Sequence, residues 1–297
     1  MTKKVFLHDL NNGKINTSLM VIKRLYKEGN KTIYLLSDKS GYINGKISSR
    51  LSLEPGMVIQ AEGDKDSILD VTHASIISDY NVEDYLASVK RPIEDIMDEI
   101  EEITNECITS VQGKKLNDYF FKDENFLEKF KKSIGGVSMH HNYIGGLAEH
   151  TLGVMKLTKI LCDIYDCRRR EIAVLSAKLH DIGKIYEMDY TGPFKYTLEG
   201  ELQGHIVIGV QMIDRAIIDL GIPFSDDFIM RIKGCIVQHH GKLEYGSPKL
   251  ANMEESIILN RADSVDATLN KINQLKEVTK EGTWSQYERA VETKLYL

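Results

Sequence analysis

The spacing of apolar residues changes near Asp79, and this change divides the chain into two parts with different secondary structure. Before it, short apolar runs alternate with turn residues such as Glu28-Gly29-Asn30 and Glu54-Pro55-Gly56, a pattern that predicts β-strands. The expected strands span 19–26, 32–37, 42–48, 57–62 and 67–78. Five short strands of this kind fit a small closed or nearly closed barrel, with an OB-fold as the leading candidate.

After Asp79 the apolar residues recur at helical spacing. Ile93, Ile96, Ile100 and Ile103 follow Pro92, which a first helical turn tolerates, and they predict an amphipathic helix. Further helices are expected at 124–133, 146–165, 169–186, 203–220, 226–239, 253–276 and 284–294. We therefore expect a multidomain β + α chain with an OB-like barrel over residues 1–80, a helical linker over 81–122 and an all-α bundle over 123–297.

The distribution of charge and the cysteines indicate a cellular compartment but do not identify a substrate. Residues 1–80 carry eleven Lys/Arg against nine Asp/Glu, which gives +2 there and −8 in the remainder of a chain of net charge −6. A slightly basic barrel is compatible with nucleic acid. Four cysteines without CxxC spacing indicate reduced thiols. With no signal peptide and no apolar run long enough to span a bilayer, we expect a cytoplasmic protein without membrane contact.

The barrel half offers side chains suited to single-stranded nucleic acid. Tyr26, Tyr34 and Tyr42 can stack on bases, and Lys23 and Arg24 are among the basic residues interleaved with them along the chain. The alternative is that the tyrosines are half-buried strand residues and the basic residues protect strand edges.

Seven of the nine histidines fall between His140 and His240, and five of them form an ordered series with aspartates. The series is His150, His180-Asp181, His205, His239-His240 and Asp263. Imidazole and carboxylate groups bind divalent metals, and a set of this size can surround two ions. Each position lies in or at the end of an expected helix, so the ligands would converge in a bundle core. This pattern indicates a metal-dependent hydrolase.

The series, together with MHHNYIGGLAEHT over 139–151 and LHDIGK over 179–184, resembles the HD-domain superfamily of metal-dependent phosphohydrolases. With an N-terminal barrel that contains SDKSG, the chain resembles the YhaM-type 3′→5′ exoribonuclease family along most of its length. The resemblance implies hydrolysis of single-stranded RNA, and also of single-stranded DNA, from the 3′ end to nucleoside 5′-monophosphates.

The resemblance also implies two metal ions, with Asp181 bridging them. The ligands of the first ion would be His150, His180, Asp181 and Asp263. Those of the second would be His205, His239 and His240. Mixed His/carboxylate ligation favours Mn, Fe, Co or Ni over Mg. The ions would activate a water for attack on the terminal phosphodiester, with Asp181 and Lys184 in the catalytic set.

Two residues near the series have two interpretations each. Lys184 would contact the substrate phosphate and offset its charge, or it is an exposed helix end. His141 would face the same phosphate, as the family motif implies, or it caps or packs a helix.

Other functions remain open. One is an HD-type phosphohydrolase of free nucleotides or cyclic dinucleotides with a regulatory barrel. Gly146, where cyclic-dinucleotide members can place a glutamate, and the missing GYP signature disfavour cyclic dinucleotides. A binding module with a degenerate metal site would require missing ligands, and none is missing. We expect Trp284 and Tyr287 to pack on the same chain, with a homo-oligomer as the alternative.

Overall fold

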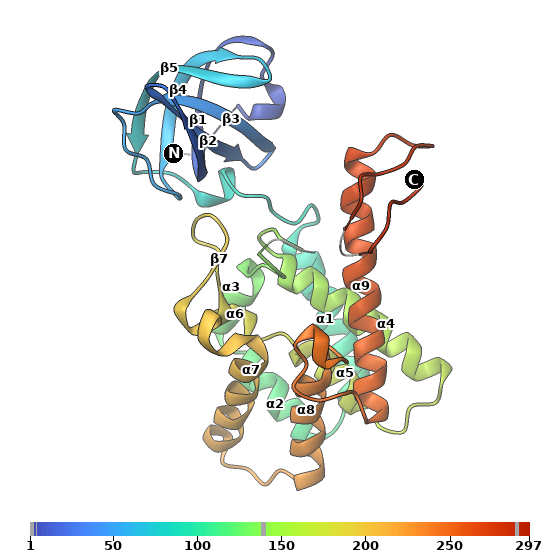
Figure 1. Ribbon diagram of the computed structural model, residues 1–297. Coiled ribbons are helices and arrows are strands. Elements are labelled where there is room, and N and C mark those ends of the chain that lie inside the picture. Colours follow the sequence, from blue (N-terminus) through green and yellow to red (C-terminus); the bar gives the residue numbers. More distant parts are fainter. Residues whose placement is uncertain (1–2, 4, 138–140, 289–290) are drawn as a thin grey trace. The chain divides into compact units, whose positions relative to one another are not determined.

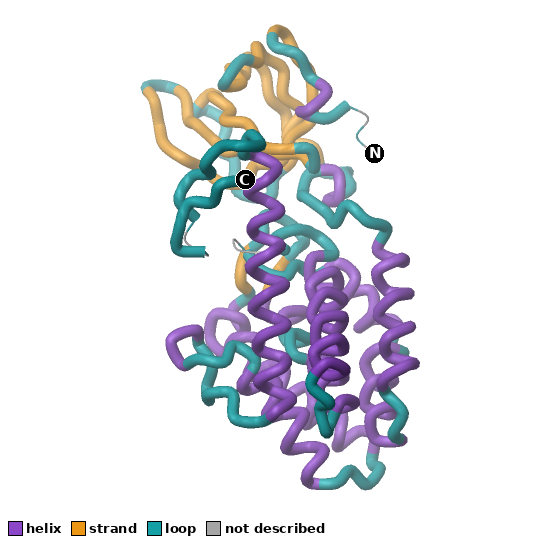
Figure 2. The backbone as a smooth tube through the Cα atoms, turned by 90° about the vertical axis from the view of Figure 1, so that its right-hand side faces the viewer, coloured by secondary structure: helices purple, strands orange, loops and turns teal. Residues whose placement is uncertain are grey.

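The computed structural model describes residues 3, 5–137, 141–288 and 291–297. The chain divides into two compact units, one formed by Met1–Ser88 with Asp189–Lys195 and the other by Val89–Met188 with Tyr196–Leu297. The first unit is built around strands and the second around helices (Figure 1 and Figure 2). The expected fold class, a small β-barrel followed by an all-α bundle, is therefore confirmed.

Five strands form the barrel, and each contains or overlaps an expected one. They are β1 (Gly13–Glu28), β2 (Lys31–Asp38), β3 (Gly41–Ser48), β4 (Val58–Lys65) and β5 (Ile68–Ile77). The order β1-β2-β3-β5-β4 closes on itself because the long strand β1 pairs with β2 at one end and with β4 at the other. β3 and β5 run parallel, and the other neighbours are antiparallel. A closed five-stranded arrangement is the one expected of an OB-fold.

Alternate residues of the strands fill the barrel. Leu19 and Val21 in β1 and Leu36 in β2 are fully buried, and Tyr34 lies two residues before Leu36 in the same core. Successive side chains of a strand point to opposite faces, so these positions share the inner face. The barrel thus closes over its own apolar core.

The second unit is a bundle of helices. They are α1 (Ile93–Cys107), α2 (Val111–Phe121), α3 (Glu124–Lys132), α4 (Gly146–Ile164), α5 (Arg170–Leu179), α6 (Lys184–Glu187), α7 (Leu198–Leu220), α8 (Asp226–Gln238) and α9 (Glu254–Val278). Two short strands, β6 (Met188–Asp189) and β7 (Lys195–Tyr196), pair between α6 and α7. Within the described residues, none of the helices combines the length and the apolar character that a membrane span requires.

Helix α1 shows why the range expected as a linker packs in the bundle. It begins after Pro92, with Glu94 and Asp95 in the first turn, where their charge favours the helix dipole. Ile96 and Ile100 recur at helical spacing and are buried in the core of the bundle. Over residues 81–122 the structure therefore places α1 and α2 with the helical unit, from Val89 onward.

Three expected helices differ from the observed ones. The segment 169–186 is interrupted, because α5 ends at Leu179 and a turn precedes α6. The helix expected at 203–220 begins earlier and is broken at Gly204, whose φ of 72° a side chain would disfavour. The helix expected at 284–294 is wrong: its described residues pair with the C-terminal segment, as in the Trp284–Tyr296 and Glu288–Thr293 bridges. Cross-strand partners there take the backbone groups that a helix would use.

Gly183, in the turn between α5 and α6, lets this turn lie directly against α7. A methyl group at this position would overlap the carbonyl oxygen of His205 and come within 2.8 Å of the N–H group of Gly209. The glycine is therefore needed for the close approach of two backbones, not for an unusual dihedral angle, since its φ is −61°.

We predict that Gly183→Ala lowers the free energy of unfolding by about 1–3 kcal/mol, the usual cost of overpacking. Gly209→Ala is the matched control, because a methyl group there would lie at ordinary contact distances, 3.6 Å from Ile236 Cγ2 and 3.8 Å from the backbone nitrogen of Gly183. Alanine in a helix interior is worth roughly 0.5–1 kcal/mol over glycine, so the control should be neutral or stabilised. Urea unfolding followed by circular dichroism measures both. Equal midpoints for the two variants would contradict the close approach.

Candidate metal centre

The expected ligands come from five places in the helical unit and meet in its interior. They lie in α4 (His150), in the turn after α5 (His180, Asp181), after the Gly204 break in α7 (His205), directly after α8 (His239, His240) and in α9 (Asp263). Most of them are shielded from solvent, with His150 and His180 at 0% exposure and Asp181 at 2%. Residues spread over more than a hundred positions of sequence thus form one cluster.

Asp181 lies at the centre of this cluster, and its Oδ2 atom faces one set of ligands. It is 3.5 Å from Nε2 of His150 and 3.3 Å from Nε2 of His180. Oδ1 of Asp263 lies 3.2 Å from the same nitrogen of His150. These are the residues that the family resemblance assigns to the first ion.

The other carboxylate oxygen of Asp181 faces a second set. Its Oδ1 lies 3.5 Å from Nε2 of His205 and 3.6 Å from Nε2 of His239. His240 completes this side, because His205, His239 and His240 each offer a ligand atom within 4.8 Å of the others. One carboxylate therefore lies between two histidine-rich groups, as a bridging ligand requires.

Each of these five histidines is held through its Nδ1 atom. The acceptors are the carbonyls of Ala177 for His180 (2.8 Å), Ile236 for His239 (2.7 Å) and Tyr245 for His240 (2.9 Å), and the carboxylates of Asp266 for His150 (2.7 Å) and Glu187 for His205 (3.0 Å). Carbonyl and carboxylate oxygens only accept, so Nδ1 carries the hydrogen and the neutral ring keeps its lone pair on Nε2. Such an arrangement is the usual one for histidines that bind a metal.

Acceptor atoms face one another in this cluster without a hydrogen between them. Oδ1 of Asp181 and the Nε2 atoms of His205 and His239 are buried and have no hydrogen-bond partner among the described residues. The Nε2 atoms of His150 and His180 are 3.3 Å apart, a contact that is repulsive unless a proton or a metal ion lies between them. Buried polar atoms without partners are rare and costly. The residues present therefore fit divalent metal ions, which prefer this mixture of nitrogen and oxygen donors.

Lys184 is buried beside Asp181. Its Nζ lies 2.6 Å from Oδ2 of Asp181 and donates to the carbonyl oxygen of Gly135 at 2.7 Å, and only 8% of the residue is exposed. The interpretation of Lys184 as an exposed helix end is therefore wrong. Burial raises the pKa of Asp181, but the charges of Lys184 and His180 outweigh burial and hold this pKa well below its ordinary value. Asp181 is thus a carboxylate.

The surroundings of His239 and of His150 shift the pKa values of these two rings in opposite directions. Burial lowers the pKa of His239, and the neighbouring His240 and His180 lower it further, so this ring is neutral. Burial also lowers the pKa of His150, but hydrogen bonds to surrounding carboxylates, Asp181 first among them, raise it well above the ordinary value. Positive charge is therefore favoured on the side of His150, where three carboxylates gather.

Asp266 supports the centre and was not among the expected residues. Its Oδ2 accepts from Nδ1 of His150 at 2.7 Å and lies 2.9 Å from Nε2 of His141. Asp266 follows Asp263 by three residues, and residues at this spacing lie on one face of a helix. The sequence therefore contained a signal for Asp266, which is its spacing from the expected ligand.

Glu187 supports the opposite side. Its Oε1 accepts from the backbone N–H of His205 at 2.9 Å and from Nδ1 of the same residue at 3.0 Å. The break at Gly204 exposes this N–H group, which a continuous helix would use internally. No sequence pattern indicated Glu187, because its role depends on that break.

His141 lies behind His150. It is 2% exposed, its Nδ1 is 3.1 Å from the hydroxyl of Tyr143, and its backbone N–H donates to Oδ1 of Asn270 at 3.0 Å. This position favours the packing interpretation over contact with a phosphate. The neighbouring His140 lies outside the described residues.

The barrel residues expected to contact nucleic acid fall into two groups. Tyr34 is 4% exposed in the barrel core, so its ring is not available to a base, and the expectation of stacking at Tyr34 is wrong. The reason is the alternation of β2, which points position 34 inward. Lys23, Arg24, Tyr26 and Tyr42 are exposed and remain candidate contacts, with 61% exposure for Tyr42.

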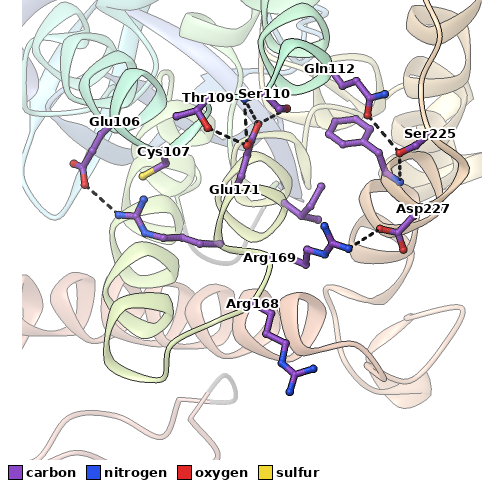
Figure 3. Close-up of a pocket in the computed structure, with 13 residues that line it drawn as sticks. Glu106, Cys107, Thr109, Ser110, Gln112, Arg168, Arg169, Glu171, Ser225 and Asp227 are labelled. Carbon is purple, nitrogen blue, oxygen red and sulfur yellow. Dashed lines mark hydrogen bonds and ion pairs between the residues drawn. The ribbon is translucent and has the colours of Figure 1, made fainter.

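A separate cavity of about 490 Å³ lies where α1 ends and where α2, α5 and α8 begin (Figure 3). Its polar groups largely satisfy one another. Glu171 accepts from the N–H of Ser110 at 3.0 Å and from its hydroxyl at 2.6 Å, and Arg169 lies 3.5 Å from Asp227. The centre at Asp181, where buried acceptors have no partner among the residues that the structure describes, is the stronger candidate for a functional site.

The helical unit matches a known family. Residues 147–268 match the family model of the HD domain. This segment contains the whole ordered series from His150 to Asp263. HD domains are metal-dependent hydrolases, in agreement with the chemistry of the ligand set.

The chain is also similar to proteins named 3′-5′ exoribonuclease YhaM. The relative from Geobacillus sp. (strain WCH70) is 33% identical over 218 residues, which cover 72% of this chain and 65%, just under two thirds, of that relative. The relative from Bacillus subtilis (strain 168) is 26% identical over 313 aligned positions, which cover 100% of this chain and 98% of that relative. No solved structure matches the chain. The resemblance stated from the motifs is confirmed.

We predict that Asp266→Asn weakens Mn²⁺ binding by about 10- to 100-fold while every expected ligand stays in place. The amide has no charge with which to increase the basicity of His150. Isothermal titration calorimetry measures the affinity. Asp98→Asn, the same change at an exposed position of α1, serves as the control. Unchanged affinity in Asp266→Asn would show that this carboxylate does not act on the ligand.

Proposed function

We propose that this HD-domain hydrolase, which resembles the YhaM 3′-5′ exoribonucleases, shortens single-stranded RNA from the 3′ end. Divalent metal ions would assist the reaction. The products would be nucleoside 5′-monophosphates. Single-stranded DNA is a second polymer substrate of the same chemistry. The helical unit would carry the hydrolysis and the barrel would hold the strand.

The arrangement of the five histidines around Asp181 is the observation that carries this proposal. Each Nδ1 atom is bound to an acceptor, which leaves the Nε2 atoms for a metal, and the two oxygens of Asp181 face different histidines. These contacts support two ions with Asp181 between them. The first would be held by His150, His180, Asp181 and Asp263. The second would be held by His205, His239, His240 and Asp181.

Bound ions of this kind lower the pKa of a water and offset the charge of a phosphodiester. The nitrogen-rich ligand set favours Mn, Fe, Co or Ni over Mg, which binds mainly through oxygen. The side chains of the protein would hold these ions and stabilise the charge on the phosphate.

Asp181 and Lys184 act together in this proposal. Lys184 is bound to Oδ2 of Asp181 and to the carbonyl oxygen of Gly135, so it fixes the carboxylate and adds a buried positive charge. This charge would stabilise the negative charge that develops on the phosphate during attack. The first role of Lys184 is therefore to orient Asp181, and any contact with phosphate comes second.

The exposure of the ligands indicates the side from which substrate arrives. The side chains of Asp263 and His205 are 16% and 13% exposed, whereas those of His150 and His180 are fully buried. A phosphate would therefore reach the centre past Asp263 and His205. The buried histidines would hold the floor of the site.

The barrel supplies the proposed contacts upstream of the reacting end. Lys23, Arg24 and Tyr42 are exposed on the barrel, and side chains of these kinds suit the phosphates and bases of a single strand. The compartment we propose is the reducing cytoplasm, because Cys107, Cys162, Cys167 and Cys235 are all free and buried.

We predict that protein supplied with Mn²⁺ degrades a 5′-labelled single-stranded RNA to a ladder that shortens from the 3′ end. Asp181→Asn should slow this reaction by about 100- to 1000-fold, the usual effect of losing a central electrostatic group. Asp98→Asn should retain the rate. A sequencing gel separates the products. Intact RNA, with consumption of free nucleotides or cyclic dinucleotides instead, would replace the exonuclease with the phosphohydrolase alternative.

We further predict two tightly bound Mn²⁺ ions per chain, and one in His240→Gln or in Asp263→Asn, because each variant removes a ligand from one side only. Equilibrium dialysis with elemental analysis gives the number directly. His73→Gln, in the barrel and exposed, should retain both ions. A single ion in the wild-type chain would refute the assignment of two sites.

A further inference from the structure

The C-terminal segment exposes aromatic rings that the proposed site does not use. Trp284 is 66% exposed, Tyr296 64% and Tyr287 61%, although the sequence led us to expect Trp284 and Tyr287 to be packed. Large aromatic side chains rarely stay exposed together on a surface without a partner. These rings therefore require an explanation of their own.

Hydrogen bonds shape the segment into a two-stranded ribbon. The N–H of Ser285 donates to the carbonyl of Leu295 at 2.8 Å, and the N–H of Leu297 donates to that of Thr283 at 3.1 Å. Farther along, the N–H of Glu288 donates to the carbonyl of Thr293 at 3.0 Å. The backbone that carries Trp284 and Tyr296 is thus held in one conformation.

The two sides of the ribbon differ. Ser285 is buried at 4%, whereas Trp284 and Tyr296, directly opposite each other, are exposed. Residues two apart in a strand share a face, so Gln286 and Lys294 lie on the side of the rings, and both are exposed. We call Trp284, Gln286, Lys294 and Tyr296 the outward face. It contains two rings, one amide and one positive charge.

The ribbon is attached to the helix that leads from the metal centre. Figure 1 shows the C-terminal segment beside the end of α9, and Lys271 of α9 lies 3.4 Å from Glu288 of the ribbon. α9 also carries Asp263, and the fifteen residues from there to Val278 span about 22 Å at 1.5 Å per residue. The ribbon is therefore anchored to the same helix that carries the candidate ligand Asp263.

We propose that the outward face binds single-stranded nucleic acid, with a base stacked on Trp284 or Tyr296 and a phosphate at Lys294. This inference rests on the proposed function, since it gives the polymer substrate a second contact. The two rings pack edge to face with their centroids 5.6 Å apart, which leaves a ring face available to a base. Stacking on aromatic rings near a positive charge is how single strands are held without regard to sequence.

The composition of the face favours nucleic acid over a protein partner. Protein interfaces of this size have an apolar centre in which aliphatic and aromatic side chains pack together. Leu295, the aliphatic residue of the pair Ser285–Leu295, lies on the other side of the ribbon and is half-buried. Flat rings flanked by an amide and an ammonium group match bases and phosphates better.

Trp284 is the one tryptophan in the sequence, so its fluorescence reports on this face directly. The experiment uses the full chain with Asp181→Asn, which preserves the RNA during the measurement. An oligoadenylate of about twelve nucleotides, within the roughly 4–16 that single-strand sites cover, is titrated in. We expect saturable quenching of Trp284, with the same dissociation constant that fluorescence anisotropy of labelled oligoadenylate gives. Inorganic polyphosphate, which has charge but no bases, should not quench.

Tyr296→Ala in the same background should weaken oligoadenylate binding by about 5- to 100-fold, the range reported for loss of one stacking ring. Tyr165→Ala is the matched control, because Tyr165 is 71% exposed at the end of α4. Circular dichroism verifies that both variants are folded.

The outcomes separate this inference from the function on which it rests. One outcome is that, by anisotropy, RNA binds the Asp181→Asn chain and the chain with the added Tyr296→Ala change equally well, with no quenching of Trp284. That result would overturn the proposed contact at the outward face and leave the proposed exonuclease function standing. A tryptophan spectrum that shifts with protein concentration in the absence of RNA would also overturn it, because a second copy would then cover the face. RNA that is neither bound by the Asp181→Asn chain nor degraded by the wild-type protein would refute the proposed function itself.

Discussion

The buried carboxylate of Asp181 has two oxygens that must be satisfied from different sides, and the helical unit is arranged around this requirement. α5 ends immediately before His180 and α8 immediately before His239. The last carbonyls of a helix have no partner within it, and in both cases the carbonyl three residues earlier accepts from Nδ1 of the histidine. One local arrangement thus satisfies a helix end and aims a ligand at Asp181. His205 reaches the same place by another route, through the break at Gly204.

Negative charge accumulates around this point, and the protein balances only part of it. Asp181, Asp263, Asp266 and Glu187 surround the histidines, with Lys184 as the cation bound to Asp181. Carboxylates are costly to bury unless positive charge compensates them. The buried acids outnumber the lysine beside them, and burial lowers the pKa of His239 and His240, so the site can take up further positive charge. The charges of the site therefore favour divalent ions, as the kinds of possible ligand do.

Residues that have few structural roles could be predicted from the sequence. Residues whose role depends on a contact with a distant part of the chain could not. The cluster around Asp181 was predictable because histidines in an ordered series with aspartates have few other uses, and the barrel was predictable because its turns and apolar runs are local. Tyr34 was misjudged because a tyrosine serves a core and a surface equally well. Glu187 was missed because its partner N–H group becomes available only when α7 breaks. The helix expected near Trp284 failed because the pairing of that segment with Tyr296 depends on contacts that helical propensity does not include.

Helix α9 has a fixed length as a consequence of what it carries. Asp263, Asp266 and Asn270 lie on one face because they are three and four residues apart, and they contact the centre, His150 and the segment of His141. Inserting or deleting one residue between them would turn everything beyond it by about 100°. Asp263, Asp266 and the C-terminal ribbon would then point in different directions. The contacts of the centre therefore depend on the number of residues between Asp263 and Asn270 more than on the exposed side chains of the helix. Changes in chain length must accumulate in the turns, and a shift of register in α9 would mark a descendant that has given up the centre, the ribbon or both.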